Sequence, residues 1–138
     1  INFLQILIAK ICNEFPSYKG TVISKKKILE KYKFSICFEN TKDIPGYISE
    51  KIFDCFFAGC IPIYLGANNI ENYIPSNCFI DMSCYSSYNH LYKYISTMDK
   101  KTYLQYLNNI ENFIQGNKSK QFTSQYYAKN IVSNIIND

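Results

Sequence analysis

Two short apolar runs flank a stretch with helical spacing in the middle of the chain. Residues 34–38 (FSICF) and 61–65 (IPIYL) have the length and composition of buried parallel strands. Between them, Ser49 offers a helix N-cap, and a helical face follows it, made of Ile52, Phe53, Phe56 and Phe57. The order strand, loop, helix, strand predicts a βαβ unit and hence an α/β domain with a parallel sheet.

Further elements are expected on both sides of this unit. Before it, residues 1–13 predict an amphipathic helix, residues 14–22 a loop or short strand, and residues 25–31 a short polar helix. After it, residues 68–73 predict a helical turn and residues 79–81 a third short strand.

From Ser87 onward the spacing of apolar residues is helical, with breaks expected near Asp99 and at 116–119. The last helix, at about 122–136, has an apolar face made of Tyr127, Ala128, Ile131, Val132, Ile135 and Ile136. We expect this face to pack on the domain, and contact with a membrane surface is the less favoured alternative.

Composition limits the classes of protein that need to be considered. The chain has 138 residues, 47% apolar and 19% charged, which is typical of one folded domain. No apolar stretch approaches the roughly 18–20 residues of a membrane span. The chain begins with Ile1 and has no signal-peptide pattern, so we expect it to be a domain of a longer protein.

The charged and sulfur-containing residues narrow the chemistry further. Fifteen Lys and no Arg against eleven Asp and Glu give a net charge of +4, with the lysines spread thinly. This balance is compatible with an acidic small ligand and is less typical of nucleic-acid binding, but an ordinary lysine-rich soluble surface is the favoured interpretation. The six Cys form no CxxC pair and His90 is the single histidine, so a zinc site is not expected. Cys37 and Cys55 are interpreted as buried, reduced thiols, which favours a cytoplasmic location.

Candidate binding residues gather where the first predicted strand ends and the following helix begins. Glu39 and Asn40 follow residues 34–38, and ligands of open α/β sheets bind at that edge. Tyr47, Glu50 and Lys51 stand at the start of the helix and are expected to converge on the same crevice.

Lys51 is the most informative of these residues, because a cation in the first turn of a helix is locally unfavourable by up to about 1 kcal/mol. An anionic ligand would explain Lys51, and a diol such as a ribose would explain the Glu50 carboxylate. The structural alternative is a pair between Lys51 and Asp54, with Glu50 simply favourable at a helix start. Taken alone, such small costs favour this alternative.

Several common site motifs are absent. The sequence has no GxGxxG, no GxxxxGK[ST] and no DxD motif. Acidic residues do not cluster at metal-ligand spacing, so no metal-binding residues are predicted.

The stretch from Tyr32 to Asp81 nevertheless resembles the signature region of the α-1,3/4-fucosyltransferases, glycosyltransferase family ten. The matches occur in order over 50 residues, and weaker similarity covers most of the chain. They are Tyr32-Lys33-Phe34, Phe38-Glu39-Asn40, Tyr47-Ile48-Ser49-Glu50-Lys51, Pro62, Gly66, Pro75 and Phe79-Ile80.

The resemblance implies the Rossmann-like carboxyl-terminal half of a GT-B glycosyltransferase, with residues 1–138 as a single domain that binds GDP-fucose. By motif position, Glu50 would bind the donor ribose and Lys51 would face the diphosphate. Glu39, Asn40, Tyr47 and Ser49 would complete the donor pocket. The resemblance favours the functional interpretation of Glu50 and Lys51 over the structural one.

The implied reaction is inverting transfer of L-fucose to a glycan hydroxyl in α-1,3 or α-1,4 linkage. The family's general base is a carboxylate of the amino-terminal half, so no catalytic residue is assigned in this chain, which alone is expected to be inactive. The family's donor-phosphate arginine would be replaced or lie before Ile1. No cofactor is implied, and stimulation by a divalent metal stays open.

Two other hypotheses stay open: a GT-B half for another nucleotide sugar, and an inactive truncated domain. The expected partners are GDP-fucose, a glycan acceptor and the protein's own amino-terminal domain, with no nucleic acid. Membrane contact is expected only through other parts of the full protein, at a cytoplasmic or peripheral membrane location in a bacterial or viral source.

Overall fold

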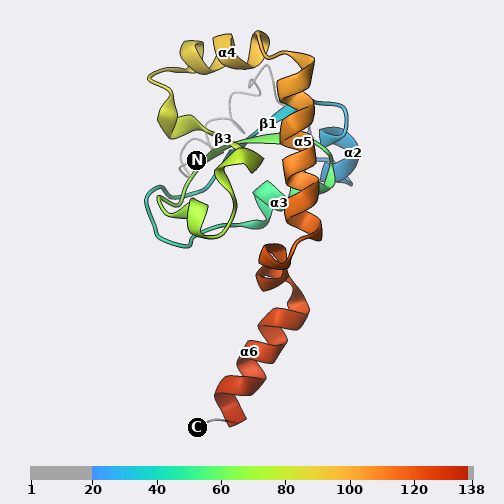
Figure 1. Ribbon diagram of the computed structural model, residues 1–138, viewed down its shortest axis with the longest axis vertical. Coiled ribbons are helices and arrows are strands. Elements are labelled where there is room, and N and C mark those ends of the chain that lie inside the picture. The colour runs from blue at the N-terminus through green and yellow to red at the C-terminus, as the bar shows by residue number, and fades with distance from the viewer. Residues whose placement is uncertain (1–19, 137–138) are drawn as a thin grey trace.

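A three-stranded parallel sheet forms the centre of the fold in a computed structural model of the chain (Figure 1). The structure describes residues 20–136, so the predicted helix 1–13 and residues 14–19 lie outside the described part. The strands are β1 (Phe34–Phe38), β2 (Ile61–Leu65) and β3 (Ile80–Asp81), in the order β1-β2-β3. The first two have the predicted bounds, and β3 is one residue shorter than predicted.

Pro62 lies in the central strand, a position that proline usually avoids because it cannot donate to the ladder. Ile61 donates its N–H to the Lys33 carbonyl, on the β1 side, at 2.9 Å. In a parallel strand, successive residues direct their backbone N–H groups to opposite neighbouring strands. The nitrogen of Pro62, which carries no hydrogen, therefore faces β3. Pairing with β3 begins only at Ile63, which pairs with Ile80, so the proline costs no hydrogen bond.

Helix α3 (Glu50–Phe57) connects β1 to β2, as the sequence predicts. It ends at Ala58, and Gly59 follows with a φ of 68°. Gly59 donates its N–H to the Phe56 carbonyl and Cys60 donates to the Cys55 carbonyl, at 3.1 and 3.0 Å. These two bonds form a Schellman motif, which requires a left-handed residue at the position of Gly59.

Most of the remaining elements agree with the sequence pattern apart from their ends, whereas the 3₁₀ turns η2 and η3, and η4 within the break expected at 116–119, were not predicted. The polar helix predicted at 25–31 is α2 (Lys25–Leu29), and the turn predicted at 68–73 is η1 (Ile70–Asn72). The breaks expected near Asp99 and Gly116 fall between successive helices. The other elements are η2 (Ser76–Cys78), η3 (Met82–Cys84), α4 (Tyr88–Ser96), α5 (Lys100–Gln115), η4 (Asn117–Phe122) and α6 (Ser124–Ile136).

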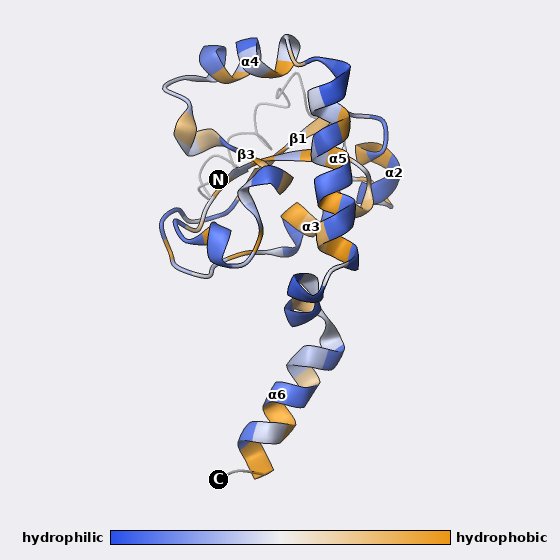
Figure 2. Cartoon of the chain, in the orientation of Figure 1, coloured by the Kyte–Doolittle hydropathy of each residue, from blue (hydrophilic) through white to orange (hydrophobic). Residues whose placement is uncertain are grey.

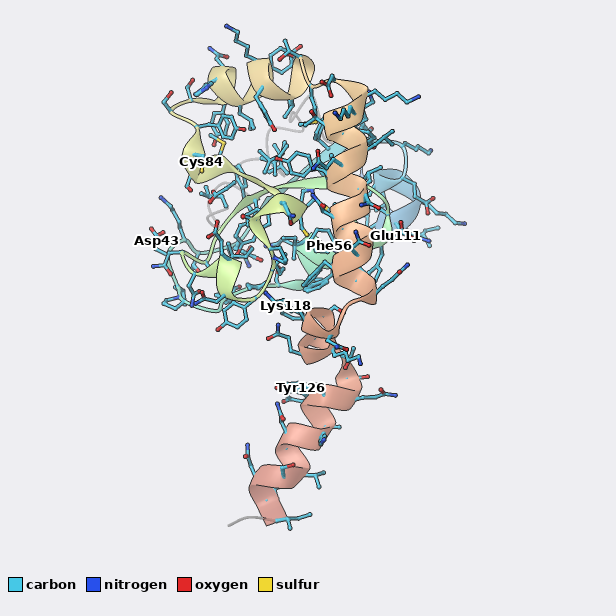
Figure 3. All side chains as sticks on the ribbon, viewed as in Figure 1. Asp43, Phe56, Cys84, Glu111, Lys118 and Tyr126 are labelled. Atoms are coloured by element: carbon cyan, nitrogen blue, oxygen red, sulfur yellow. The ribbon has the colours of Figure 1, made fainter. Side chains whose placement is uncertain are left out.

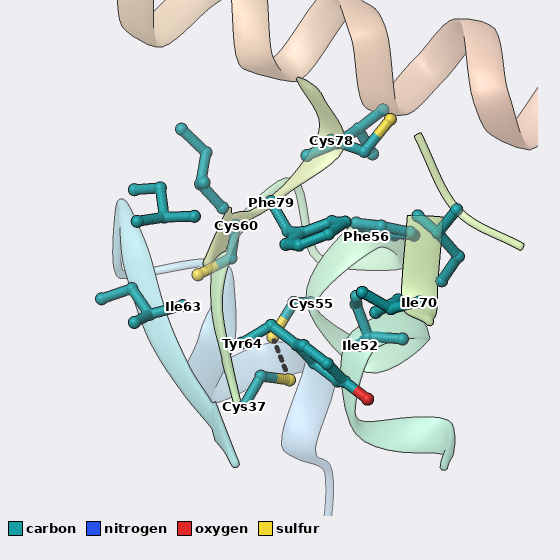
Figure 4. Packing of buried hydrophobic residues seen from close by; sticks show 14 of the residues in the cluster. Cys37, Ile52, Cys55, Phe56, Cys60, Ile63, Tyr64, Ile70, Cys78 and Phe79 are labelled. Carbon is teal, nitrogen blue, oxygen red and sulfur yellow. Dashed lines mark hydrogen bonds between the residues drawn. The ribbon is translucent and has the colours of Figure 1, made fainter. Parts of the chain in front are cut away.

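The core lies between the sheet, α3 and α5 (Figure 4). Phe56 of α3 meets Phe113 of α5 edge to face, with ring centroids 5.9 Å apart. The Cys37 and Cys55 sulfurs are 3.7 Å apart, and both residues are buried, as predicted. The Cys55 contact and burial raise the pKa of Cys37 far above its ordinary value, and burial raises the pKa of Cys78 to about 11. The five described cysteines are free thiols.

The expectation that the last helix packs on the domain is wrong within the described chain. Helix α6 starts at Ser124 rather than at 122, because residues 117–122 form the 3₁₀ helix η4. Figure 2 shows α6 extending away from the sheet with hydrophobic and hydrophilic residues alternating along it. No residue of α6 is buried, and Ile136 is 75% exposed. None of the described helices is long and apolar enough to cross a membrane.

Candidate functional site

The first turn of α3 lies beside the carboxyl end of β1, and the sequence fixes this arrangement locally. Ser49 is extended, with φ −96° and ψ 179°, and its side chain caps the helix by accepting from the Lys51 N–H at 3.5 Å. Ile52, Cys55 and Phe56 anchor the other face of the helix in the core. This packing leaves the side chains of Glu50 and Lys51 at the edge of the sheet.

The Glu39 carboxylate ties β1 to α3. Its side chain is 0% exposed. It accepts from the Ser49 N–H at 2.8 Å, the Ser49 hydroxyl at 2.7 Å and the Lys51 ammonium at 3.2 Å. Because a buried charge requires such partners, Glu39 acts as a clamp that sets the position of the helix start.

Lys51 stands at the rim of this clamp. Its ammonium also donates to the Asn40 side-chain oxygen at 3.1 Å, and its side chain is 32% exposed. The alternative pair with Asp54 is not formed, because Asp54 binds the Lys25 ammonium at 3.0 Å. Lys51 therefore has a structural partner, Glu39, and its side chain is still partly exposed to solvent.

Glu50 lies next to Lys51 but points to a different partner. Its carboxylate is 3.5 Å from the Lys25 ammonium and its side chain is 68% exposed. The backbone N–H of Glu50, and more weakly Lys25, hold the pKa of this carboxyl below its ordinary value. Glu50 is therefore ionised at neutral pH and accessible to hydroxyl donors.

Sequence reasoning missed Lys25, which belongs to a run of three lysines. A signal for it was present, because Glu50 and Asp54 are like charges four residues apart on one helix and favour a cation between them. The Lys25 ammonium is that cation, although only three-dimensional structure brings α2 against α3.

The loop that carries Tyr47 is held by Tyr64 of β2 and by Asn69, which follows β2. The Gly46 N–H donates to the Asn69 side-chain oxygen at 2.8 Å, and the Tyr64 hydroxyl donates to the Tyr47 carbonyl at 3.4 Å. Burial raises the pKa of Tyr64, so its hydroxyl stays protonated and able to donate. Tyr47 itself is 38% exposed beside the start of α3.

The structure thus brings the six predicted residues to the carboxyl edge of the sheet, but these residues differ in their contacts. Glu39, Asn40, Ser49 and Lys51 are joined by hydrogen bonds, whereas the side chains of Tyr47 and Glu50 stand free of that network. The exposed groups are a cation, an ionised carboxylate, an aromatic ring and a helix N-terminus. In residues 20–136 no three potential ligands are grouped so as to hold a metal ion.

A parallel α/β sheet with a helix N-terminus and polar side chains at its carboxyl edge is the architecture of the Rossmann-like class of α/β domains. Comparisons with known proteins narrow this class. The model of glycosyltransferase family 10 (fucosyltransferase), carboxyl-terminal part, matches residues 3–133. The chain therefore belongs to the fucosyltransferase family 10 of glycosyltransferases, as the signature residues indicated.

Curated relatives agree with this assignment. A 4-galactosyl-N-acetylglucosaminide 3-alpha-L-fucosyltransferase 9 from Cricetulus griseus is 40% identical over 98 residues, covering 64% of this chain and 26% of that protein. The alpha-(1,3)-fucosyltransferase FucT of Helicobacter pylori is 34% identical over 88 residues, covering 62% and 18%. The chain thus spans about a quarter of the first of these relatives and less than a fifth of the second.

Solved structures agree at the level of the fold. A crystal structure of an alpha1,3-fucosyltransferase with GDP-fucose matches with a TM-score of 0.59 and 32% identity, over 66% of this chain and 27% of that one. A structure of an alpha1,3-fucosyltransferase with GDP matches with a TM-score of 0.58 and 33% identity, over 66% and 28%. The predicted fold class, a Rossmann-like GT-B half with a helical carboxyl-terminal end, is confirmed.

Proposed function

We propose that this chain is the donor-binding half of a fucosyltransferase that transfers L-fucose from GDP-fucose to a glycan hydroxyl. The supporting observation is that a partly exposed Lys51 and an exposed, ionised Glu50 lie next to each other in the first turn of α3. The printed names of the relatives, and the GDP-fucose bound in a similar structure, point to the same donor.

In this proposal the residues around α3 have distinct roles. Lys51 and the α3 N-terminus stabilise the diphosphate, and Glu50 accepts hydrogen bonds from the ribose hydroxyls. Tyr47 and Asn40 line the pocket. Glu39 and Ser49 act as positioning residues, because their polar atoms already serve the clamp inside the protein.

Lys51 has to serve two anions in this arrangement. Its charge is partly neutralised by Glu39 at 3.2 Å, so a diphosphate would share the ammonium with that carboxylate. Lys25 likewise has to release Glu50 for a ribose, at a small cost, because this ion pair is exposed and long. The helix N-terminus adds attraction that neither pairing removes.

The proposed reaction is an inverting displacement. An acceptor hydroxyl oxygen forms a bond to the fucose anomeric carbon as the bond from that carbon to the GDP phosphate oxygen breaks. The hydroxyl proton passes to a general base of the amino-terminal half, and the electron pair leaves with GDP. Lys51 and the α3 N-terminus would stabilise the charge that builds on the leaving diphosphate.

Calorimetric titration of the chain with GDP, and with UDP as the comparison nucleotide, tests the donor site. We expect binding of GDP and not UDP, weakened about tenfold or more in Lys51→Ala and in Glu50→Ala, since each change removes charge-assisted hydrogen bonds. Lys26→Ala is the matched control, because within the described residues Lys26 pairs only with Glu30, the residue that caps the carboxyl end of α2.

Three results would count against the proposal. Equal affinity for UDP would favour the alternative of another nucleotide sugar. Undiminished GDP binding by both α3 variants would place the nucleotide elsewhere. Absence of GDP binding by the folded 138-residue chain and by a chain extended at its amino end would favour an inactive domain.

A further inference from the structure

A concave surface lies at the opposite edge of the sheet from the proposed donor residues. It is a groove of about 470 Å³ between η2, the carboxyl-terminal end of α5 and the start of η4. Asn77, on its wall, comes three residues before β3, whereas Glu39 and Asn40 come directly after β1. Because the strands are parallel, these positions belong to opposite edges. Figure 3 shows Lys118 of the groove well apart from Asp43 in the loop of the donor edge.

The groove is lined mainly by amides. The chain contains 15 asparagines among 138 residues, yet four of the eight lining residues are asparagines. Abundance of asparagine in the chain as a whole therefore does not account for this concentration. The four are Asn77, Asn109, Asn112 and Asn117.

The walls of the groove are held in place by the fold. The Asn109 side-chain nitrogen donates to the Asn77 carbonyl at 3.2 Å, which joins α5 to η2. The Cys78 thiol donates to the Asn109 carbonyl at 3.5 Å. Phe113, with 6% exposure, and Pro75 form an apolar floor. Such a site is largely formed before any ligand arrives.

Two of the amides have no hydrogen-bond partner within residues 20–136. Asn112 and Asn117 are exposed, and each offers two N–H donors and a carbonyl acceptor. Among residues 20–136, Lys118 supplies the single charge of the lining, and none of these residues contributes a carboxylate to the groove. Amide donors and acceptors above an apolar floor suit a ligand that has many hydroxyl groups and apolar C–H faces. Because the described lining carries a single charged side chain, the groove suits an uncharged ligand.

We propose that this groove binds a neutral oligosaccharide, at a site separate from the nucleotide site. The walls of Asn77 and Asn109 would hold the sugar against Pro75 and Phe113, while Asn112 and Asn117 bond to its hydroxyl groups. The inference goes beyond the proposed transfer reaction, because glycan binding here requires neither Glu50 nor Lys51.

Titration of the isotopically labelled 138-residue chain with N-acetyllactosamine, followed by NMR, tests the groove. We expect saturable shifts of the side-chain NH₂ signals of the four groove asparagines. The double variant Asn112→Ala/Asn117→Ala should bind about tenfold more weakly, since two hydrogen-bonding amides are lost. Asn108→Ala is the matched control, because Asn108 is exposed on the same helix but does not line the groove.

Three other outcomes would overturn the groove site. The first is shifts confined to the signals of Asn40, Tyr47 or Lys51, and the second is unchanged affinity in the double variant. The third is the absence of shifts in a chain whose spectrum is that of a folded domain. GDP titration of the double variant separates the two proposals, because it should match that of the unsubstituted chain. Glycan binding without GDP binding would overturn only the donor site.

Discussion

Helices α3 and α6 each carry an apolar stripe, but the protein uses the two stripes differently. In α3, Ile52 and Phe56 are almost completely buried against the sheet and α5. In α6, Ile131 and Ile135 point to solvent along a helix that extends from the domain (Figure 1). Helical periodicity therefore identifies an apolar face, but it does not identify the surface that covers the face.

The chain connections explain the difference. Helix α3 lies between two paired parallel strands, and such a crossover has to pack back onto its own sheet. After α5, the last aromatic anchor is Phe122 of η4, whose ring centroid is 4.7 Å from that of Phe53. No strand follows in the described chain to bring α6 back to the sheet.

Among the changes that test this comparison of α3 with α6, Phe56→Ala is expected to have the largest effect. Phe56 is 4% exposed and its ring meets both Phe53 and Phe113, so the change leaves a cavity in the core. We expect a loss of about 3–5 kcal/mol in the free energy of unfolding. Phe57→Ala is the matched control, because the neighbouring ring is 60% exposed. Urea denaturation followed by circular dichroism measures both, and similar losses would contradict the burial of this stripe.

A smaller effect, still within the α/β region, is expected from Gly66→Ala. A Cβ at this position would overlap the Tyr64 hydroxyl and lie 2.6 Å from the Glu39 Cγ. Because Glu39 is fixed by the clamp and Tyr64 is 1% exposed, neither side chain moves freely. We expect a loss of about 1–3 kcal/mol in the free energy of unfolding.

A double-mutant cycle tests this cause. Tyr64→Phe removes the hydroxyl that the new methyl group would meet, so the loss from Gly66→Ala should be smaller in the Tyr64→Phe background. Strict additivity of the two changes, measured by the same urea denaturation, would show that the Tyr64 hydroxyl is not the source of the instability and would leave the Glu39 Cγ, 2.6 Å from the new methyl group, as the nearest remaining cause.

The sequence predicted the α/β region well because local signals there agree with one another. Apolar composition defines β1 and β2, Ser49 caps α3 and Gly59 ends it, so the predicted bounds of both strands and the predicted start of α3 match the structure. The same order of elements predicted that the residues after β1 and at the start of α3 would lie together at the carboxyl edge of the sheet, and the structure places them there.

The partners of the site residues could not be predicted in this way. Sequence spacing suggested Asp54 as the ion-pair partner of Lys51. In the structure, Lys51 pairs with Glu39, and Asp54 pairs with Lys25. Contacts between elements depend on how α2, β1 and α3 pack in space, which no local pattern encodes. The exposure of α6 escaped prediction for the same reason.

The smallest effect is expected from removal of α6 after Thr123. No residue of the helix is buried, while Phe122 and its contacts with Phe53 and Phe113 remain in the shortened chain. We therefore expect a change within about 0.5 kcal/mol in the free energy of unfolding, as for surface changes in general. Removal from Asn117 onward, which also deletes Phe122, should cost clearly more. If the shorter deletion costs as much as the longer one, then α6 contributes packing of its own, and its stripe resembles that of α3 after all.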